Sequence, residues 1–144
     1  MTPDELKELM TTLDDSWNNQ DWETFTARHA ENTAVYWPGQ PEPTRGVQDH
    51  RAESEAFFKA FENHIDNRPY RILIAEDNWT CSVARWTGTM IGPMAGPDGA
   101  EVKSTGRSFE LEFCTVATWQ NGQITEERLF YDQVGFMRQL GLGG

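Results

Sequence analysis

Asp132 is the carboxylate in this sequence with the strongest local case for acid–base chemistry. It stands between a predicted last strand, "QITEERLFY", and a predicted last helix, "DQVGFMRQLG". The apolar residues around it are Phe130, Tyr131, Val134 and Phe136. Apolar surroundings raise the pKa of a carboxyl group and make its carboxylate a stronger base. The position also suits a helix N-cap, where an aspartate accepts hydrogen bonds from free amides. Both roles stay open, and one carboxylate can perform both.

Strand alternation decides which side chains share a face with Asp132. Successive side chains of a strand point to opposite faces, so this face includes Phe130, Arg128, Glu126 and Ile124. We expect it to point into a pocket. Arg128 is then either a cation that steadies an enolate or an ordinary surface arginine. Epoxide opening would need a second carboxylate near Asp132, and Glu126 is the candidate on the same strand.

Aromatic side chains are the candidate walls of that pocket. In "RSFELEF" the inward positions are predicted to be the aromatic and aliphatic ones, which leaves Glu110 and Glu112 to solvent. Trp86 alternates with Arg85, and we expect Trp86 to face inward. His50 is either a second acid–base group or an exposed or hydrogen-bonded helix histidine. The candidate substrate-binding residues are Tyr36, Trp37, His50, Phe57, Phe61, Trp86, Phe113 and Arg128.

The sequence contains none of the strong motifs for cofactors or metals. It has no glycine-rich phosphate loop, no HExxH, no GxSxG and no Cys/His ligand spacing. His29, His50 and His64 are spread through the predicted helical half, so a metal site would require distant residues to meet. We therefore expect no metal and no cofactor, and any catalysis should rely on acid–base side chains.

Length, charge and cysteine content indicate one soluble domain, residues 1–144. The net charge of −11 opposes binding to nucleic acid and to anionic lipid, so we expect neither as a partner. The N-terminus lacks the pattern of a signal peptide, and no stretch approaches 18 apolar residues. We therefore expect a cytoplasmic location. Cys81 and Cys114 have no paired spacing, which predicts reduced thiols.

Helical periodicity dominates the first half of the chain and strand patterns the second. Helices are predicted from a Thr2 cap through "NNQD", over "WETFTARHA" to near Asn32, and from Val47 to about His64. Predicted strands are "TAVYW", "YRILIAE", "WTCSVARWTGTMIG", "GRSFELEFCTVATW" and "QITEERLFY", with "QNGQ" as a hairpin turn before the last. This order predicts the α+β class: a cone-shaped barrel of a strongly curved mixed or antiparallel sheet, packed on N-terminal helices, with a short C-terminal helix. Such a cone offers an apolar pocket.

Several of these segments together resemble one known family. The runs "TRGVQDH", "TCSVARWTGTMIG", "QNGQITEE" and "YDQVGFMRQLGL" are similar to the SnoaL-like polyketide cyclase (ester cyclase) family of the nuclear transport factor 2-like superfamily. The resemblance spans nearly the whole chain. Its most specific part is an aspartate after the final strand, followed seven residues later by "QLG". The resemblance implies a cone-shaped barrel with a hydrophobic pocket, no cofactor, and a homodimer formed through the sheet.

The resemblance also implies an activity. Characterised cyclases of the family close a ring by intramolecular aldol condensation with an aspartate as acid–base group, and that aspartate falls on Asp132. The implied substrate is a small apolar or aromatic carbonyl compound, and the enzyme class is cyclase or lyase–isomerase. Many relatives carry a histidine near Tyr36 and a tryptophan where this chain has Arg128. The same fold also serves dehydratases, isomerases, epoxide hydrolases and non-catalytic binding or dimerisation domains, and these alternatives stay open.

Overall fold

The fold is described by a computed structural model that covers residues 1–96 and 98–143. The helices of this part are α1 (Pro3–Asn18), α2 (Trp22–Ala27), α3 (Val47–Ala60) and α4 (Gln133–Gln139). The longer strands are β1 (His29–Tyr36), β3 (Phe61–Asp66), β4 (Ile72–Glu76), β5 (Trp79–Met90), β8 (Ser108–Gln120) and β9 (Gln123–Phe130). Three two-residue strands are β2 (Thr44–Arg45), β6 (Met94–Ala95) and β7 (Glu101–Val102). No helix among these is long and apolar enough to cross a membrane.

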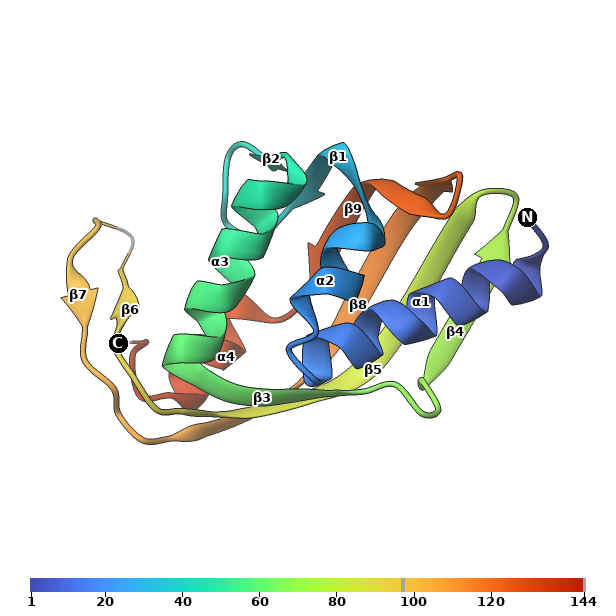
Figure 1. Ribbon diagram of the computed structural model, residues 1–144. Coiled ribbons are helices and arrows are strands. Elements are labelled where there is room, and N and C mark those ends of the chain that lie inside the picture. The colour runs from blue at the N-terminus through green and yellow to red at the C-terminus, as the bar shows by residue number, and fades with distance from the viewer. Residues whose placement is uncertain (97, 144) are drawn as a thin grey trace.

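The main sheet is mixed and strongly curved. Its strand order is β2-β1-β9-β8-β5-β3, and β4 also pairs with β5. Strands β1 and β9 are parallel, whereas the other pairs in this sheet are antiparallel. Helices α1, α2 and α3 lie on one face of the sheet, and the β6–β7 hairpin extends beyond the end where α4 lies (Figure 1). The predicted α+β architecture is confirmed in the form of a curved sheet rather than a closed barrel.

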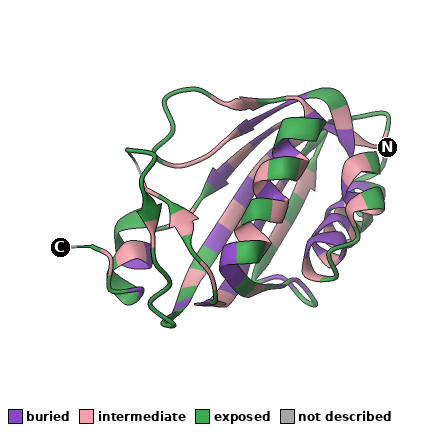
Figure 2. Ribbon diagram, turned by 60° about the vertical axis from the view of Figure 1, so that its left-hand side comes forward, coloured by how far each residue is buried: buried purple, intermediate pink, exposed green. Residues whose placement is uncertain are grey.

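Helix α1 forms where the sequence predicts it. Thr2 and Glu5 make a reciprocal capping box, and a proline at the first helical position has no amide hydrogen to leave unpaired. The apolar stripe of α1 packs on the sheet, and its buried residues are Leu6, Met10, Leu13 and Trp17. Figure 2 colours the buried residues of the chain purple. The cap therefore fixes where this helix begins, and the amphipathic spacing fixes which of its sides faces the sheet.

Two predicted helices are longer than the observed ones. Helix α2 ends at Ala27, and His29 already begins strand β1, so the prediction of helix to near Asn32 is wrong. Helix α3 ends at Ala60, because Phe61 has an extended backbone and pairs with Met90 of β5. The prediction that Phe61 belongs to the α3 face is therefore wrong, since the strand pairing outweighs the helical period at this position.

The β8–β9 hairpin contains an irregularity that decides which side chains of β9 face the helices. Asn121 and Gly122 both have positive φ, as the predicted tight turn requires. Beyond the turn Trp119 pairs with Ile124, but Thr118 pairs with Glu126, so β9 carries one extra residue at this point. Such a bulge reverses the alternation that follows it. Glu127 is consequently buried, and Glu126 lies on the opposite face, which corrects the predicted inward face of this strand.

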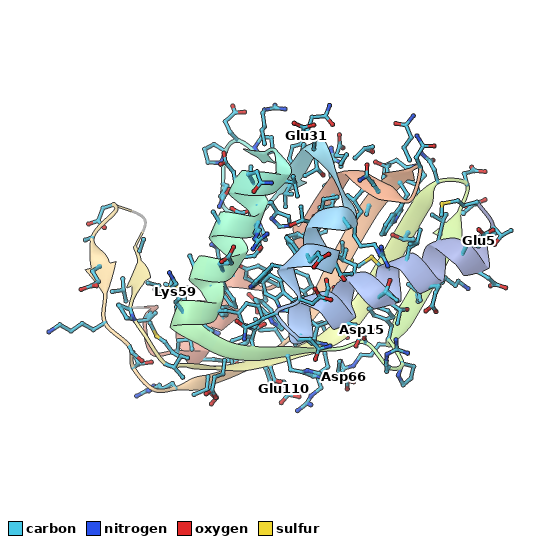
Figure 3. The ribbon with its side chains drawn as sticks, in the orientation of Figure 1. Glu5, Asp15, Glu31, Lys59, Asp66 and Glu110 are labelled. Carbon is cyan, nitrogen blue, oxygen red and sulfur yellow. The ribbon has the colours of Figure 1, made fainter. Side chains whose placement is uncertain are left out.

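The space between the helices and the sheet is filled with side chains, whereas the other face of the sheet has both charged and exposed apolar side chains. The labelled residues Asp66 and Glu110 lie beyond the sheet, away from the helices (Figure 3). Trp86 is buried and Arg85 is exposed, and Glu110 and Glu112 are also exposed, which confirms these predictions of alternation. Both cysteines are free thiols, as expected.

Candidate functional site

An aromatic cavity lies between the helices and the covered face of the sheet. It leaves about 40 Å³ for the centres of water-sized molecules, which is room for a few waters. Most of its wall is apolar. The residues that line it are Met10, Leu13, Asp14, Trp17, Phe25, His29, Trp37, His50, Phe57, Ile65, Trp86, Phe113, Thr115, Glu127 and Leu129. We call this space the aromatic cavity.

A wider groove adjoins the aromatic cavity. Trp37 and Phe57 line both spaces, and the groove continues past Phe61 and Tyr131 to the β6–β7 hairpin at Met94. Trp37 and Phe57 therefore form the wall that the two spaces share.

Glu127 is the centre of a buried polar cluster in the aromatic cavity. Its Oε1 atom lies 2.9 Å from Nε2 of His29 and 3.2 Å from Nε2 of His50. Burial alone would raise the pKa of this carboxyl group, but its hydrogen bonds and charge interactions with His29 and His50 hold the pKa well below its usual range. A carboxylate buried among aromatic rings is therefore kept ionised by two histidines.

His29 stands at the first position of β1, directly after α2. Its Nδ1 atom lies 2.7 Å from the backbone oxygen of Phe25, which can only accept, so Nδ1 carries a hydrogen. The ring is thereby fixed with Nε2 toward Glu127. His29 is 2% exposed, and its role is set by this interior hydrogen bonding rather than by solvent.

His50 is held from both sides by carboxylates. Its Nδ1 atom donates to Oε1 of Glu53 over 2.9 Å, and its Nε2 atom faces Glu127. Burial lowers the pKa of His50, but the hydrogen bonds to Glu127 and Glu53 outweigh burial and raise the pKa to about 9. Glu53 is itself oriented, because it accepts hydrogen bonds from Nε1 of Trp37 at 2.7 Å and from the hydroxyl of Thr44 at 2.8 Å.

Asp14 is a second buried carboxyl group in the same cavity. It lies on the buried face of α1, and its Oδ2 atom accepts a hydrogen bond of 2.6 Å from the hydroxyl of Tyr70. Burial raises the pKa of Asp14 to about 7, against the opposing effect of the Tyr70 hydrogen bond, and the negative charge of Glu127 adds to the increase. A carboxyl group that titrates near neutral pH can both take up and release a proton.

The aromatic cavity thus combines two kinds of polar group. Asp14 is suited to move a proton, and the His29–Glu127–His50 cluster can hold a polar or anionic atom of a ligand. The same three cluster residues are also of metal-ligating types, with their ligand atoms within 4.8 Å of one another. Environments that push the pKa values of neighbouring groups apart are typical of acid–base sites.

Most predicted substrate-binding residues meet in this region. The cavity brings together Trp37, His50, Phe57, Trp86 and Phe113, and the groove includes Phe61. They come from α3, β5, β8 and neighbouring segments that are far apart in sequence. The structure thus brings together the aromatic residues that alternation and helical spacing suggested.

Tyr36 and Arg128 lie apart from these residues. The guanidinium carbon of Arg128 is 4.4 Å from the ring centroid of Tyr36, and Arg128 also pairs with Glu126. Both Arg128 and Glu126 are about 40% exposed in their side chains. Within residues 1–96 and 98–143, neither Tyr36 nor Arg128 is among those that line the cavity or the groove.

Asp132 is the N-cap of α4. Its Oδ1 atom accepts a hydrogen bond of 2.8 Å from the amide of Gly135, and a side chain at Gly135 would collide with the carboxylate. Asp132 is exposed, and of the described residues it is its neighbours Tyr131 and Gln133, not Asp132, that line the groove. The geometry supports the cap role, and the catalytic role of Asp132 stays a prediction.

Asp14, His29 and Glu127 were missed as functional residues by sequence reasoning. Asp14 had a usable signal, because it falls at helical spacing from Met10 and Trp17, on the apolar face of α1. Glu127 had none, because the bulge that turns it inward is not visible in the strand pattern. His29 was identifiable only as a histidine, since its partners lie far away in sequence.

Comparisons with known proteins agree with this fold. A search of curated proteins found no significant match. Among solved structures, a candidate SnoaL-like polyketide cyclase from Jannaschia sp. CCS1 is 20% identical, with a TM-score of 0.84 over 99% of this chain and 95% of that one. A candidate polyketide cyclase from Xanthomonas campestris pv. campestris is 17% identical, with a TM-score of 0.83 over 97% and 99%. AclR, a candidate hydroxylase from Streptomyces galilaeus, is 18% identical, with a TM-score of 0.79 over 97% and 98%.

These structural likenesses establish the architecture, since identities near 20% carry no more than the fold. The family itself follows from the sequence model. The model of the SnoaL-like polyketide cyclases matches residues 7–140, a range that contains all the residues named above as lining the aromatic cavity. The chain belongs to the SnoaL-like polyketide cyclase family.

Proposed function

We propose that this protein is a cyclase-type acid–base enzyme that acts on an apolar or aromatic carbonyl compound, with Asp14 as the base. The observation that carries the proposal is the position of Asp14: a buried carboxyl group in an aromatic cavity that also contains the His29–Glu127–His50 cluster. Family membership supports a ring-closing reaction, and the lining supports a substrate that stacks on aromatic side chains.

The proposed reaction is an intramolecular aldol closure. Asp14 removes a proton from the carbon next to a carbonyl group, and the electron pair of the broken C–H bond becomes an enolate. His50 carries a proton at neutral pH, and its positive charge stabilises the enolate oxygen. The enolate carbon then attacks a second carbonyl carbon of the same substrate, and the resulting alkoxide takes the proton back from Asp14.

Tyr70 has a positioning role in this scheme. Its hydroxyl donates to Asp14 and lies 3.0 Å from the backbone oxygen of Met10, so it fixes one oxygen of the Asp14 carboxylate on α1. Burial and the nearby charge of Asp14 raise the pKa of Tyr70, which keeps the phenol protonated. The Asp14 carboxyl group held in this way lines the aromatic cavity.

Of the other reactions known in this fold, epoxide opening receives no support from the geometry. It depended on Glu126 as a second carboxylate beside Asp132. Glu126 instead pairs with Arg128 on the face of the sheet turned away from the helices.

The test uses an aryl 1,5-diketone, whose aldol closure gives a six-membered ring that can be followed by product analysis. We expect closure by the native protein above the buffer rate, and a loss of about 10²–10⁴-fold in kcat for Asp14→Asn. Quenching of tryptophan fluorescence should show that this variant still binds the diketone, because Trp17, Trp37 and Trp86 line the cavity.

Asp15→Asn is the matched control for this experiment. Asp15 is the next residue on α1 but pairs with Arg68 at the surface, outside the cavity. We expect its turnover to equal that of the native protein. Equal turnover in Asp14→Asn and Asp15→Asn would contradict a base role for Asp14. Binding of the diketone with no closure by the native protein would favour a binding module instead.

We also propose that a second copy of the chain covers the outer face of the sheet. Apolar side chains line up across four strands there, since Ile72 pairs with Val83, Val83 with Cys114, and Cys114 with Phe130. Phe130 is 51% exposed and Ile74, on the same face, is 55% exposed. Exposed apolar rows of this kind are typical of protein interfaces.

Light scattering during gel filtration tests this second proposal. We expect a dimer for the native chain and a monomer for Ile74→Lys, because a charge in the apolar row must be desolvated at the interface. A monomeric native chain at micromolar concentration would contradict the proposal. Glu8→Lys is the control for changed surface charge alone, because Glu8 is exposed on α1, which lies on the other face of the sheet.

A further inference from the structure

We propose that His29, His50 and Glu127 bind one divalent transition-metal ion of the Zn²⁺ type, with an open coordination position toward the aromatic cavity. The three ligand atoms come from β1, α3 and β9, and they lie within 4.8 Å of one another. This site was not expected from the sequence, because no ligand spacing connects these residues along the chain.

The ligand geometry fits such an ion. Zn²⁺ binds histidine nitrogen and carboxylate oxygen at about 2.0–2.2 Å, so neighbouring ligand atoms around a tetrahedral ion lie about 3.3 Å apart. The Glu127 Oε1 atom is 2.9 Å from Nε2 of His29 and 3.2 Å from Nε2 of His50. The ligand atoms of His29 and His50 lie within 4.8 Å of one another, so the three side chains can converge on one ion.

The outer hydrogen bonds of both histidines are those of metal ligands. A histidine that binds a metal through one ring nitrogen usually donates the other N–H to a carbonyl or carboxylate oxygen. His29 donates Nδ1–H to the backbone oxygen of Phe25, and His50 donates Nδ1–H to Glu53. Both rings therefore present Nε2 to the same point. Trp37 and Thr44 in turn fix the carboxylate of Glu53, which completes an ordered second layer.

The donor set selects the class of ion. Two imidazole nitrogens with one carboxylate oxygen suit Zn²⁺ and its transition-metal neighbours, whereas Ca²⁺ and Mg²⁺ prefer oxygen ligands only. Three protein ligands with one side open to a cavity are typical of catalytic rather than structural zinc sites. Glu127 is 3% exposed and His50 is 4% exposed, so the ion would be shielded from bulk solvent.

A bound ion would also take part in the proposed reaction. This catalytic role rests on the proposed function, whereas the binding site itself does not. As a Lewis acid, the ion would polarise the carbonyl group of the substrate. This would lower the pKa of the neighbouring C–H group, from which Asp14 removes the proton. The ion would hold the enolate oxygen in place of the histidine proton. No oxidant or reductant is needed for this role.

Zn²⁺ titration of the metal-stripped protein, followed by calorimetry, tests the inference. We expect one saturable site in the native protein and at least about a 100-fold higher Kd for Glu127→Gln, which keeps the size of the side chain but removes its charge. Glu53→Gln should raise the Kd about 10–100-fold, because it alters only the outer hydrogen bond of His50.

His64→Gln is the matched control. His64 is the remaining histidine of the chain, and it is exposed on β3. The control is needed because the acidic surface of this chain can also attract cations weakly. If Zn²⁺ binding is unchanged in Glu127→Gln, or is lost in His64→Gln, the proposal is overturned. The absence of any saturable site in the native protein overturns it as well.

A measurement on the native protein avoids dependence on the folding of variants. Histidine ring nitrogens are followed by NMR during Zn²⁺ addition, and we expect the Nε2 signals of His29 and His50 to shift while those of His64 stay in place. Shifts confined to His64 contradict the site.

The metal site and the proposed function can fail separately. Asp14→Asn should lose ring closure and keep the Kd for Zn²⁺ within about threefold. If Zn²⁺ does not bind but Asp14→Asn still loses turnover, the metal site falls and the base role stands. If Zn²⁺ binds and Asp14→Asn still turns over, the base role falls and the metal site stands.

Discussion

Glu127 and Asp132 lie on the same chain segment, yet their environments are opposite. Glu127 is 3% exposed and contacts His29 and His50 in the aromatic cavity. Asp132 is exposed and caps α4 through the amide of Gly135. The Glu127 carboxylate thus has partners from other elements, whereas the Asp132 carboxylate caps the helix that follows it. The bulge in β9 turns Glu127 inward, whereas Asp132 lies beyond the end of β9, at the N-terminus of α4.

The comparison also shows why apolar neighbours in sequence are a poor guide to a buried carboxylate. Phe130 and Val134, two of the apolar residues near Asp132, are 51% and 69% exposed. These exposed side chains do not enclose the carboxylate of Asp132. Asp14, by contrast, has a polar neighbour in sequence, Asp15. Burial in the folded protein nevertheless raises the pKa of Asp14 to about 7. Tertiary packing therefore decides which carboxyl group is perturbed.

Glu127→Ala should produce the largest loss of stability. Removal of one partner leaves His29 and His50 buried without the negative charge that they face, and such losses cost about 3–5 kcal/mol in the free energy of unfolding. Urea unfolding at pH 7 measures the effect. Glu126→Ala, one residue earlier on the outer face, should change stability by less than about 0.5 kcal/mol. Similar losses of stability in both variants would contradict the assignment of Glu127 to the buried face of β9 and of Glu126 to the outer face.

Asp14→Asn should change the pH dependence of stability. The folded pKa of Asp14, about 7, lies above its ordinary value of 3.8, so the native state holds more protons than the unfolded state between these pH values. The free energy of unfolding therefore falls as pH rises through this window, and the Asp14→Asn substitution removes that decrease. We expect the variant to gain about 2–4 kcal/mol relative to the native protein between pH 4 and pH 8. A difference that is constant over this pH range would contradict the raised pKa.

Asp132→Ala should have the smallest of these effects. Loss of an N-cap side chain costs about 1 kcal/mol, and Asp132→Asn should cost close to nothing because asparagine is an equally good cap. Thermal unfolding of the two variants, side by side, measures this. A destabilisation of Asp132→Asn as large as that of Glu127→Ala would mean that Asp132 has buried partners.

The fold was largely accessible from the sequence because its signals are local. The Thr2 cap, the apolar stripe of α1 and the Asn121–Gly122 turn each depend on residues that are neighbours along the chain. The inward positions of β5 and β8 follow from alternation alone. Where two local patterns competed, as at Phe61, the strand pairing with β5 decided and the helical prediction was wrong.

The candidate site was less accessible because its decisive features are not local. The inward turn of Glu127 depends on a bulge, and the meeting of His29 with His50 depends on how α2, α3 and β1 pack. His50 and Trp86 could be predicted as pocket residues because each lies on the inner face of a regular element. Asp14 was identifiable in principle, since it interrupts the apolar face of α1.

The most direct test of the account compares ring closure in Asp14→Asn and Asp132→Asn with the same aryl 1,5-diketone. Both substitutions remove a carboxylate and keep an amide of similar size, so kcat/KM isolates the proton-transfer role. The account predicts a loss of at least about 100-fold in Asp14→Asn and a value within about threefold of the native protein in Asp132→Asn. A large loss in Asp132→Asn with normal closure in Asp14→Asn would contradict it.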